Sequence, residues 1–452
     1  MKKWLFLFIC SLLPLMANAS FFGVEEIDGI RYYFHTEYQF AVVWQNNKQC
    51  SGDIVIPETV EFDGVTCTVC DIEENAFYGC TGLTSVSIPS TVNAIGRSAF
   101  EGCTSLSSVT ISNSVTYIGD FAFANCPNLS SIVIPNSVKT ICAYAFMYCS
   151  SLTTVTIPES VTAIGKSPFA GCDNLGSIIV SDGNSKYDSR DNCNAIIETA
   201  TNTLVSGCKD SSIPEGVTSI DCYAFSSCVE LTSITIPNSV TYIDEGAFAG
   251  CTSLTSIDIP NSVITMGEAV FLGCTNLASV TLGNNMTSMG VATFINCSSL
   301  TSVVIPNSVT IIEPSTFYDC TSLKSVSIGS GVKEVRGYIF KNCHALTDVY
   351  CYATDVPEAT YDAFRSFNAE AATLHVPDEL VEDYRNCFPW TEFGTIVGLT
   401  GTNIDQPLNR VSGPTDYYTL DGRCISVPSD ASVNSVLPKG VYISNGKKVI
   451  IK

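Results

Sequence analysis

The chain has 452 residues, and its 22 Lys and Arg against 44 Asp and Glu give a formal net charge of −22. Such an acidic surface repels nucleic acid and anionic membranes, which argues against both as partners. Only 15% of the residues are charged, so neutral polar partners such as glycoproteins or glycans suit the chain better than ionic ones. The acidity can also serve only to keep a weakly charged, repetitive protein in solution.

Residues 1–19 have the layout of a secretory signal peptide. Two lysines precede an apolar run from Trp4 to Met16, and Ala17-Asn18-Ala19 supplies small residues for cleavage before Ser20. No later stretch approaches the roughly 20 apolar residues that a membrane-spanning helix needs. We therefore expect an exported protein without a membrane-spanning segment, on the outer cell surface or extracellular, with the periplasm as the alternative location.

Residues 20–79 lack the repeat that follows them and are predicted to form a β-rich N-terminal cap with a first partial rung. Apolar and polar residues alternate around Ile30–Phe34 and Ile54–Ile56, which is typical of strands. Cys67-x-x-Cys70 lies in a similar stretch, where two such side chains splay apart, so we expect neither a metal site nor a redox pair there. Cys50 is a candidate disulfide partner for one of these two cysteines.

Between residues 80 and 343 the pattern F-x-x-C-x-x-L occurs eleven times. Its cysteines are 23 residues apart except at one interval: Cys80, Cys103, Cys126, Cys149, Cys172, Cys228, Cys251, Cys274, Cys297, Cys320 and Cys343. A fixed period of this length predicts a solenoid, in which each rung buries its apolar face only against its neighbours. We expect a right-handed stack of 23-residue rungs with parallel β-strands and short helical turns.

One rung shows how these residues build the repeat. Leu106, Val109 and Ile111 carry the apolar positions of a strand, and a Ser-Asn or Pro-Asn turn follows, since proline is tolerated where a ladder of hydrogen bonds stops. Val115 and Ile118 mark a second short extended segment. A glycine then opens a helical turn that carries Phe and Cys into the stack.

The 22 cysteines of an exported chain would ordinarily indicate a disulfide framework. The repeat cysteines do not fit one, because cysteines of adjacent rungs would lie about 4.8 Å apart with parallel Cβ vectors that do not converge. A free thiol that points into the stack behaves as a small apolar group. We expect this cysteine ladder to be buried and reduced.

The one irregular interval between ladder cysteines is 56 residues long and contains a degenerate rung with ten extra residues. Apolar stretches on both sides of Thr199–Asn202 predict a hairpin that projects from the solenoid near residues 182–212. Cys193 and Cys208 are placed symmetrically about this hairpin. They are a candidate disulfide in an oxidising compartment, and two free thiols are the alternative.

Beyond residue 343 the repeat decays. Residues 344–400 are predicted to form terminal rungs and a C-terminal cap, with a short helix near Asp378–Arg385 and a closing aromatic cluster of Phe388, Trp390 and Phe393. A linker that contains Gly, Asn and Pro follows at residues 401–416. Residues 417–452 then form a small β-rich tail.

Written as L-x-x-V-x-I-P-x-S-V-x-x-I-G-x-x-A-F-x-x-C, the repeat resembles the BspA-like bacterial leucine-rich repeats over roughly residues 54–400. It has Ser where the general leucine-rich repeat has Asn or Cys: Ser114, Ser137, Ser160, Ser239, Ser262 and Ser308. A hydroxyl at this position would bond the backbone of the turn. The resemblance implies a leucine-rich-repeat solenoid and, as in members that attach to host matrix proteins or to other bacteria, an adhesin-like role.

The tail contains Leu420-Asp421-Gly422-Arg423 and the segment 439–448, K-G-V-Y-I-S-N-G-K-K. It is similar to the C-terminal sorting-type domains that Bacteroidetes attach to exported and surface proteins, including type IX secretion cargo. An insertion around residues 429–436 departs from their compact form. The alternative is a small β-domain that only packs on itself.

No catalytic motif accompanies the repeat. G-x-S-x-G, the P-loop and paired catalytic carboxylates do not occur in context, and the three histidines do not stand at metal-ligand spacing. We expect no catalytic residues, no metal ligands, no cofactor and no enzymatic activity.

Binding is therefore the expected function. The candidate binding residues face outward from the strands: Thr110, Tyr117, Thr156, Thr235, Tyr242, Asp258, Thr281 and Tyr350. Exposed tyrosines can stack sugars or anchor peptides, although they can instead cover neighbouring rungs. We predict a non-catalytic protein that binds an extracellular protein or glycoprotein, such as a host matrix component, or a glycan. The alternative is an envelope or periplasmic scaffold without a host role.

Overall fold

The structure is a computed structural model, and it describes residues 22–46 and 50–399 together with four strands between residues 415 and 451. The chain divides into two compact units, Met1–Val397 and Gly398–Lys452. The signal peptide expected at residues 1–19 lies outside the described residues, as does most of the expected linker. In the part of the chain that the structure describes, the helices are too short or too polar for any of them to span a bilayer.

The N-terminal cap is a β-sheet, as predicted. Its elements are β1 (Phe22–Ile27), β2 (Ile30–His35), the short 3-10 turn η2 (Thr36–Tyr38), β3 (Phe40–Val43), β5 (Thr59–Phe62) and β6 (Val65–Ile72). β1, β2 and β3 are antiparallel neighbours, whereas β3 pairs with β6 in parallel. The rings of Phe34 and Phe62 stack with centroids 4.4 Å apart. β6 pairs in parallel with β8 (Ala94–Ile95), a short strand of the first rungs.

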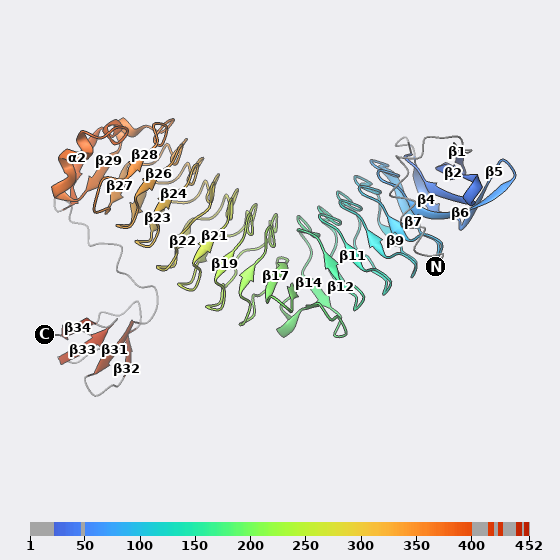
Figure 1. Ribbon diagram of the computed structural model, residues 1–452, viewed down its shortest axis with the longest axis horizontal. Coiled ribbons are helices and arrows are strands. Elements are labelled where there is room, and N and C mark those ends of the chain that lie inside the picture. The colour runs from blue at the N-terminus through green and yellow to red at the C-terminus, as the bar shows by residue number, and fades with distance from the viewer. Residues whose placement is uncertain are drawn as a thin grey trace. The chain divides into compact units, whose positions relative to one another are not determined.

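In most rungs the longer strand belongs to a series of parallel pairs, which we call the main-strand ladder (Figure 1), whereas residues 131–134 and 233–236 form no strand at the same place in their rungs. Its strands are β4 (Ser51–Val55), β7 (Gly82–Ser87), β9 (Ser108–Thr110), β12 (Thr154–Ile157), β14 (Ser177–Val180), β20 (Ser256–Asp258), β22 (Ser279–Thr281), β23 (Ser302–Ile305), β25 (Ser325–Ile328), β27 (Asp348–Cys351) and β29 (Thr373–Val376). Alternate side chains point inward, so the branched apolar residues of the repeat are buried, as for Val155 and Ile157.

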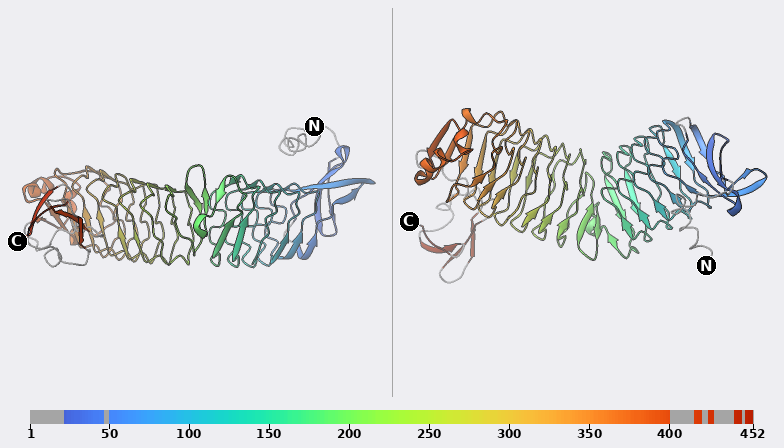
Figure 2. Two further views of the ribbon diagram at one scale, coloured as in Figure 1. Left: turned by 90° about the horizontal axis from the view of Figure 1, so that it is seen from below. Right: turned by 45° about the horizontal axis from the view of Figure 1, so that its top comes forward.

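A second ladder of two-residue strands runs along another side of the stack (Figure 2). Its strands are β8 (Ala94–Ile95), β10 (Tyr117–Ile118), β11 (Thr140–Ile141), β13 (Ala163–Ile164), β18 (Ser219–Ile220), β19 (Tyr242–Ile243), β21 (Thr265–Met266), β24 (Ile311–Ile312), β26 (Glu334–Val335) and β28 (Glu358–Ala359). The second residue of these strands points into the core in most rungs. The predicted repeat solenoid is confirmed by these two ladders.

The short helical turns expected on the third side are single turns that do not extend into a helix. Before Cys126, for example, Phe121 and Asn125 adopt the left-handed conformation with φ of 54° and 55°, which interrupts a right-handed helix. The Phe123 amide donates to the Ala145 carbonyl of the next rung at 2.8 Å, whereas the Ala124 amide donates back to Phe121 within the turn at 3.0 Å. Alternate amides therefore join neighbouring rungs, which the internal bonding of a helix would prevent.

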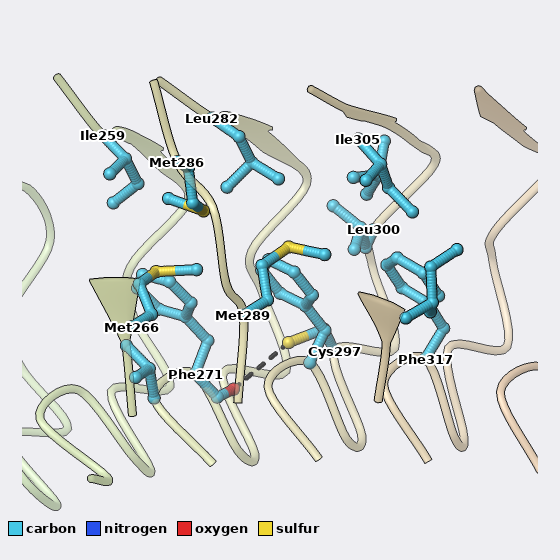
Figure 3. Close-up of a cluster of buried hydrophobic side chains, with 14 of the residues drawn as sticks. Ile259, Met266, Phe271, Leu282, Met286, Met289, Cys297, Leu300, Ile305 and Phe317 are labelled. Carbon is cyan, nitrogen blue, oxygen red and sulfur yellow. Dashed lines mark hydrogen bonds between the residues drawn. The ribbon is translucent and has the colours of Figure 1, made fainter. Parts of the chain in front are cut away.

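Stacked phenylalanine rings and buried thiols fill the core. Neighbouring rungs place their rings 5.0–5.6 Å apart from Phe77 to Phe169, and 5.2–5.9 Å apart from Phe225 to Phe340. Figure 3 shows part of this core, with Met266 and Met289 packed beside the rings and with the Cys297 thiol bonded to the Phe271 carbonyl at 3.2 Å.

The same thiol bond recurs along the solenoid. Nine ladder cysteines donate to the carbonyl of the Phe 26 residues earlier, at 3.0–3.2 Å: Cys103, Cys126, Cys149, Cys172, Cys251, Cys274, Cys297, Cys320 and Cys343. The ladder cysteines are free thiols, and all are buried except Cys228, which is half-buried. Burial raises the pKa of the thiols that make these bonds, to about 12 for Cys274, so they stay protonated and keep their donor hydrogen.

The expected serine ladder forms in part. Ser114, Ser137 and Ser160 donate to the carbonyl 22 residues earlier, at 2.6–2.7 Å. Ser308 approaches the Met286 and Asn284 carbonyls, 22 and 24 residues earlier, whereas Ser239 instead accepts from the Gly216 amide at 3.1 Å. The buried Ser262 hydroxyl has no hydrogen-bond partner among the described residues.

The insertion contains the expected antiparallel hairpin, but its strands do not project from the solenoid. They are β16 (Ile196–Glu198) and β17 (Thr203–Ser206), preceded by β15 (Tyr187–Asp188) and the turn η3 (Arg190–Asn192). β17 pairs in parallel with β18, and the strand interiors are buried, so only the tip of the hairpin is exposed. The hairpin therefore takes the place of a rung.

The hairpin also separates two hydrophobic cores. Ile196 and Val205 belong to the core that contains Phe77–Phe169, whereas Ile197 and Leu204 belong to the core that contains Phe225–Phe340. We call residues 22–181 the N-terminal segment and residues 213–397 the C-terminal segment. Successive side chains of a strand point to opposite faces, so one face of the hairpin packs against the N-terminal core and the other face against the C-terminal core.

The C-terminal cap closes the last rungs with short helices. These are η4 (Ala369–Ala371), η5 (Asp378–Leu380), α2 (Val381–Arg385) and η6 (Trp390–Glu392), followed by strand β30 (Thr395–Gly398). The short helix expected at residues 378–385 corresponds to η5 and α2. Trp390 and Phe393 are buried against Phe364, as expected, but Phe388 is 62% exposed and does not close the end.

The second unit is a four-stranded antiparallel sheet with the order β32-β31-β33-β34. Its strands are β31 (Thr415–Thr419), β32 (Cys424–Val427), β33 (Gly440–Ser444) and β34 (Lys447–Ile451). β33 and β34 lie within or next to the predicted sorting-like segment 439–448, while Leu420–Arg423 lie outside the described residues.

Candidate binding surface

One column of side chains faces away from the core, on the main-strand ladder and at the matching repeat positions of the two rungs without a strand there, and we call it the outer row. Its members are Val55, Ser87, Thr110, Val133, Thr156, Ile179, Thr235, Asp258, Thr281, Val304, Ser327 and Tyr350. Strand pairing places neighbours side by side, as in Val55–Ser87–Thr110 and Thr156–Ile179. Five of the predicted binding residues, the four threonines and Asp258, lie on this row and are exposed.

In the N-terminal segment the outer row is uncharged and partly apolar. Val55, Val133 and Ile179 are 73%, 77% and 46% exposed, between rungs that present Ser87, Thr110 and Thr156. A single exposed valine is ordinary on a protein surface, but this row repeats apolar and hydroxyl groups at the rung spacing of about 4.8 Å. It offers a partner both apolar contacts and hydrogen bonds.

A shallow, open cavity of about 460 Å³ lies where this row meets the turn after Val133. Its lining includes Val133, Pro135 and the polar residues Asn113, Asn136 and Ser137. The prediction named the threonines of the row but not Val55 or Val133. Val133 was recognisable as an outward residue of its repeat, whereas Val55 precedes the first complete repeat and has no such signal.

The outer row changes in the C-terminal segment. Ser327 is only 6% exposed, and Tyr350 is half-buried because its ring stacks on His375, 4.3 Å between centroids and 12° from parallel. His375 Nε2 lies 2.9 Å from Oδ1 of Asp348. The Tyr350 ring therefore packs against a neighbouring rung. The prediction had Tyr350 as an exposed residue that binds a ligand, whereas its ring is half-buried.

The predicted Tyr117 and Tyr242 lie on the second ladder, away from the outer row. They are 41% and 37% exposed. A hydrogen bond with Cys142 raises the pKa of Tyr117 to about 12, and donation to Asp244 Oδ1 at 2.7 Å raises that of Tyr242 to about 12. The structure thus places the predicted threonines on one row, two in each segment, and these two tyrosines on the second ladder, one in each segment.

The tyrosines at the turn edge cover neighbouring rungs. The rings of Tyr148 and Tyr223 lie against Gly171 and Gly246, where an added Cβ would come within 2.2 Å and 2.4 Å of the ring. Both tyrosines adopt a left-handed conformation, with φ of 58° and 57°. These two rings therefore pack over neighbouring rungs, which is the alternative to stacking a ligand.

A polar cluster missed by the sequence analysis lies in the C-terminal segment and interacts with Lys166 of the N-terminal segment. Asp221, Cys222 and Asp244 place ligand atoms within 4.8 Å of one another. Asp221 accepts from the Cys222 amide at 2.9 Å, and Asp244 accepts from Tyr242. The Cys222 thiol raises the pKa of Lys166, which comes from the other side of the insertion. The two carboxylates thus have hydrogen-bond partners, and the thiol interacts with a lysine. Its members stand in two different rungs, so their proximity was not visible as a motif.

The structure does not join Cys193 and Cys208, the candidate disulfide of the insertion. Both are free thiols. Cys193 bonds to the Ala195 carbonyl at 3.7 Å and belongs to the C-terminal core, whereas Cys208 bonds to the Asn194 carbonyl at 3.3 Å and belongs to the N-terminal core. The two sulfurs, one before and one after the hairpin strands, therefore pack in different cores.

Comparison with known proteins identifies the repeat. The model of the BspA type leucine rich repeat region matches residues 70–195, 204–324 and 287–400. No curated protein matches the chain. Among solved structures, a leucine-rich repeat protein from Bacteroides ovatus is 28% identical with a TM-score of 0.53, and the match covers 83% of this chain and 99% of that one.

Two further structures show the same fold. A leucine rich cell surface protein from Faecalibacterium prausnitzii is 24% identical with a TM-score of 0.53, covering 74% of this chain and 96% of that one. The pneumococcal vaccine antigen PcpA is 18% identical with a TM-score of 0.60, covering 84% and 99%. The family model matches well over half of the sequence, so this chain belongs to the BspA-type leucine-rich repeat family.

Proposed function

We propose that this protein is an exported, non-catalytic binding protein of the bacterial cell surface. Its ligand is an extracellular protein or glycoprotein, bound along the outer row of the N-terminal segment. The observation that carries the proposal is the exposure of Val55, Val133 and Ile179 on one uncharged row with hydroxyl neighbours. The structural neighbours described as a cell surface protein and a vaccine antigen support a location at the surface.

The chemistry of this row fits a neutral partner. Protein interfaces combine a desolvated apolar centre with a polar rim. Here the exposed valines supply apolar area, and Thr110, Thr156 and the polar lining of the cavity beside Val133 supply donors and acceptors. The net charge of −22 would not oppose an uncharged glycoprotein surface as it opposes nucleic acid.

The binding test compares two substitutions on the same row. Val133→Asp places a charge at the centre of the proposed surface, and Thr281→Asp places the same charge on the exposed row of the C-terminal segment. Binding of the purified variants to immobilised matrix glycoproteins and neutral glycans is measured by interferometry. We expect at least a tenfold loss for Val133→Asp and wild-type binding for Thr281→Asp. Equal binding by both variants would place the ligand elsewhere.

The location is tested separately on intact source cells. Protease is applied to the cells, and released peptides from residues 80–343 are identified by mass spectrometry. We expect solenoid peptides without lysis. Release only after the outer membrane is opened would indicate the envelope scaffold instead of a surface binding protein.

A further inference from the structure

Backbone hydrogen bonds join the turn edges of neighbouring rungs at every junction but one in the described part of the solenoid. The turn at residues 144–148, for example, donates three amide bonds to the next rung at 2.7–3.0 Å, and nine other junctions also have three such bonds. At the exception, the amides of Ser167, Phe169 and Gly171 have no acceptor among the described residues. All three residues are buried, where an unpaired amide is costly. This junction therefore lacks the bonds that hold the other rungs together.

Gly207 explains why the bonds stop here. It occupies the slot that Phe fills in other rungs, since its amide donates to the Ala224 carbonyl at 2.8 Å, just as the Phe225 amide donates to the rung that follows. The Phe225 ring fills the space beside it, because a Cβ added to Gly207 would collide with that ring. The stack of Phe rings accordingly ends at Phe169 and starts again at Phe225. The degenerate rung is thus bonded to the rung after it.

The same boundary ends both strand ladders of the N-terminal segment. β13 is the last strand of its sheet, and the Ile164 amide beyond it donates to the Tyr187 hydroxyl at 3.2 Å. β14 ends the two-stranded sheet that it forms with β12, and the Val180 amide donates to the Ser189 hydroxyl at 3.0 Å. We call this boundary, between the N-terminal segment and the insertion, the seam. Figure 1 shows that the stack changes direction here, between β14 and β17.

Side chains take the place of backbone pairing at the seam. Within the described chain, backbone–backbone bonds from residues 22–181 to later residues are limited to a local turn, in which the Asn184 amide donates to Ser181. The Asn184 side chain donates to two carbonyls of the preceding rung at 2.8 and 3.0 Å. At the turn edge, the Ser167 hydroxyl donates directly to the Tyr223 carbonyl across the seam. A few side-chain bonds therefore replace a regular ladder.

We propose that the seam is a hinge, at which the N-terminal segment opens against the rest of the solenoid while the other junctions stay closed. Opening an ordinary junction breaks three amide bonds at the turn edge, whereas opening the seam breaks the single bond from Ser167 to Tyr223 there. Regions with few such bonds open locally before the whole fold does. The movement would uncover the hairpin face that carries Ile196 and Val205, and both Phe stacks would stay intact.

The cysteine ladder supplies a reporter of opening on both sides of the seam and far from it. A buried thiol is inert to alkylation until it is exposed. The purified full chain is treated with N-ethylmaleimide under native conditions, quenched at intervals and digested with trypsin and a Glu-specific protease, which place Cys172, Cys208 and Cys251 in separate peptides. We expect Cys172 and Cys208, at the seam, to react at least tenfold faster than Cys251. Equal rates for the three thiols would overturn the proposal.

A second measurement separates opening from a static difference in exposure, since Cys172 is 8% exposed and Cys251 is fully buried. Ser167→Ala removes the bond across the seam. The control Ser160→Ala removes a similar bond at a closed junction, from its hydroxyl to a carbonyl of the preceding rung at 2.7 Å.

We expect Ser167→Ala to raise the alkylation rate of Cys172 a further severalfold and Ser160→Ala to leave it unchanged. The rate of Cys251 should stay at the wild-type value in both variants, which shows that the remaining rungs stay folded. No increase for Ser167→Ala, or the same increase in both variants, would contradict the hinge. Both measurements use purified protein without a ligand, so their outcome is independent of the proposed binding function.

Discussion

The N-terminal and C-terminal segments share one internal construction but present different outer rows. In both segments the phenylalanine rings stack, and each ladder thiol shown donates to the carbonyl of the Phe in the preceding rung. On the outside, the N-terminal segment exposes Val133 and Ile179, whereas the C-terminal segment presents Asp258 and packs Tyr350 on His375. The repeat thus constrains inward positions strictly and leaves outward positions free to differ, so the surface can vary while the scaffold is maintained.

Removal of a core ring should affect both segments strongly and equally. Phe123→Ala and Phe248→Ala each delete a fully buried ring between two stacked neighbours, and we expect a cost of about 3–5 kcal/mol for each. Thermal melts of the two variants measure the effect. A melt unchanged from wild type would contradict the inward placement, and a much smaller loss in one segment would show that its core relaxes more easily.

Two glycines distinguish backbone strain from crowding at the rung edges. Gly171 in the N-terminal segment has a φ of 67° and lies under the Tyr148 ring, whereas Gly216 in the C-terminal segment has a φ of 88° and open space around it. We expect Gly216→Ala to cost about 1 kcal/mol from strain alone and Gly171→Ala about 2–3 kcal/mol. Urea unfolding measures both, and equal losses would mean that the tyrosine moves aside without cost.

The thiol bonds should contribute about as much in one segment as in the other. Cys126→Ala and Cys297→Ala remove a buried sulfur and its hydrogen bond to a Phe carbonyl at 3.2 Å. We expect about 1–2 kcal/mol for each, from the lost hydrogen bond and the small cavity. Chemical unfolding under reducing conditions measures the free energies. If neither variant is destabilised, the sulfur serves only to fill space.

The smallest effect concerns pH and the two tyrosines of the second ladder. The pKa of Tyr117 and of Tyr242 is about 12 in the folded chain, above the ordinary value of 10, because each phenol is hydrogen-bonded. Their contribution to stability is therefore complete below pH 10 and is lost as the pH rises through 12. Phenolate absorbance titrations of Tyr117→Phe and Tyr242→Phe should each lack one late-titrating group. Loss of an ordinary group near pH 10 would refute the hydrogen bond concerned.

The period of the repeat was sufficient to predict the stack, its strands, the inward phenylalanines and the buried thiols. The bond from each thiol to a Phe carbonyl was not predictable, because the position of that carbonyl depends on the left-handed residues that break the turn, such as Phe121. The pairing of Tyr350 with His375 was also missed, since it joins a repeat residue to one beyond the last complete repeat.

The cap and the insertion were the least predictable regions, for a related reason. Outside the repeat, residue spacing carries no information on which strands become neighbours. The parallel pairing of β4 with β7 has no signature in the spacing, and the placement of Cys193 and Cys208 in different cores depends on the hairpin being built into the stack. Among the binding candidates, the repeat identified the outward threonines, but neighbouring rungs decide which outward residues stay accessible.

The alternate amides of the rung turns have a consequence for how this chain can evolve. Because the Phe123 amide bonds to the rung that follows it, every interior rung offers its successor the same set of donors and acceptors. A duplication or deletion of one 23-residue unit would join matching surfaces and lengthen or shorten the molecule by a single step. The hairpin between residues 182 and 212 lacks this interchangeability, since each of its faces is matched to a different core. Length can therefore vary freely on either side of the hairpin, while the hairpin itself is inherited as one fixed piece.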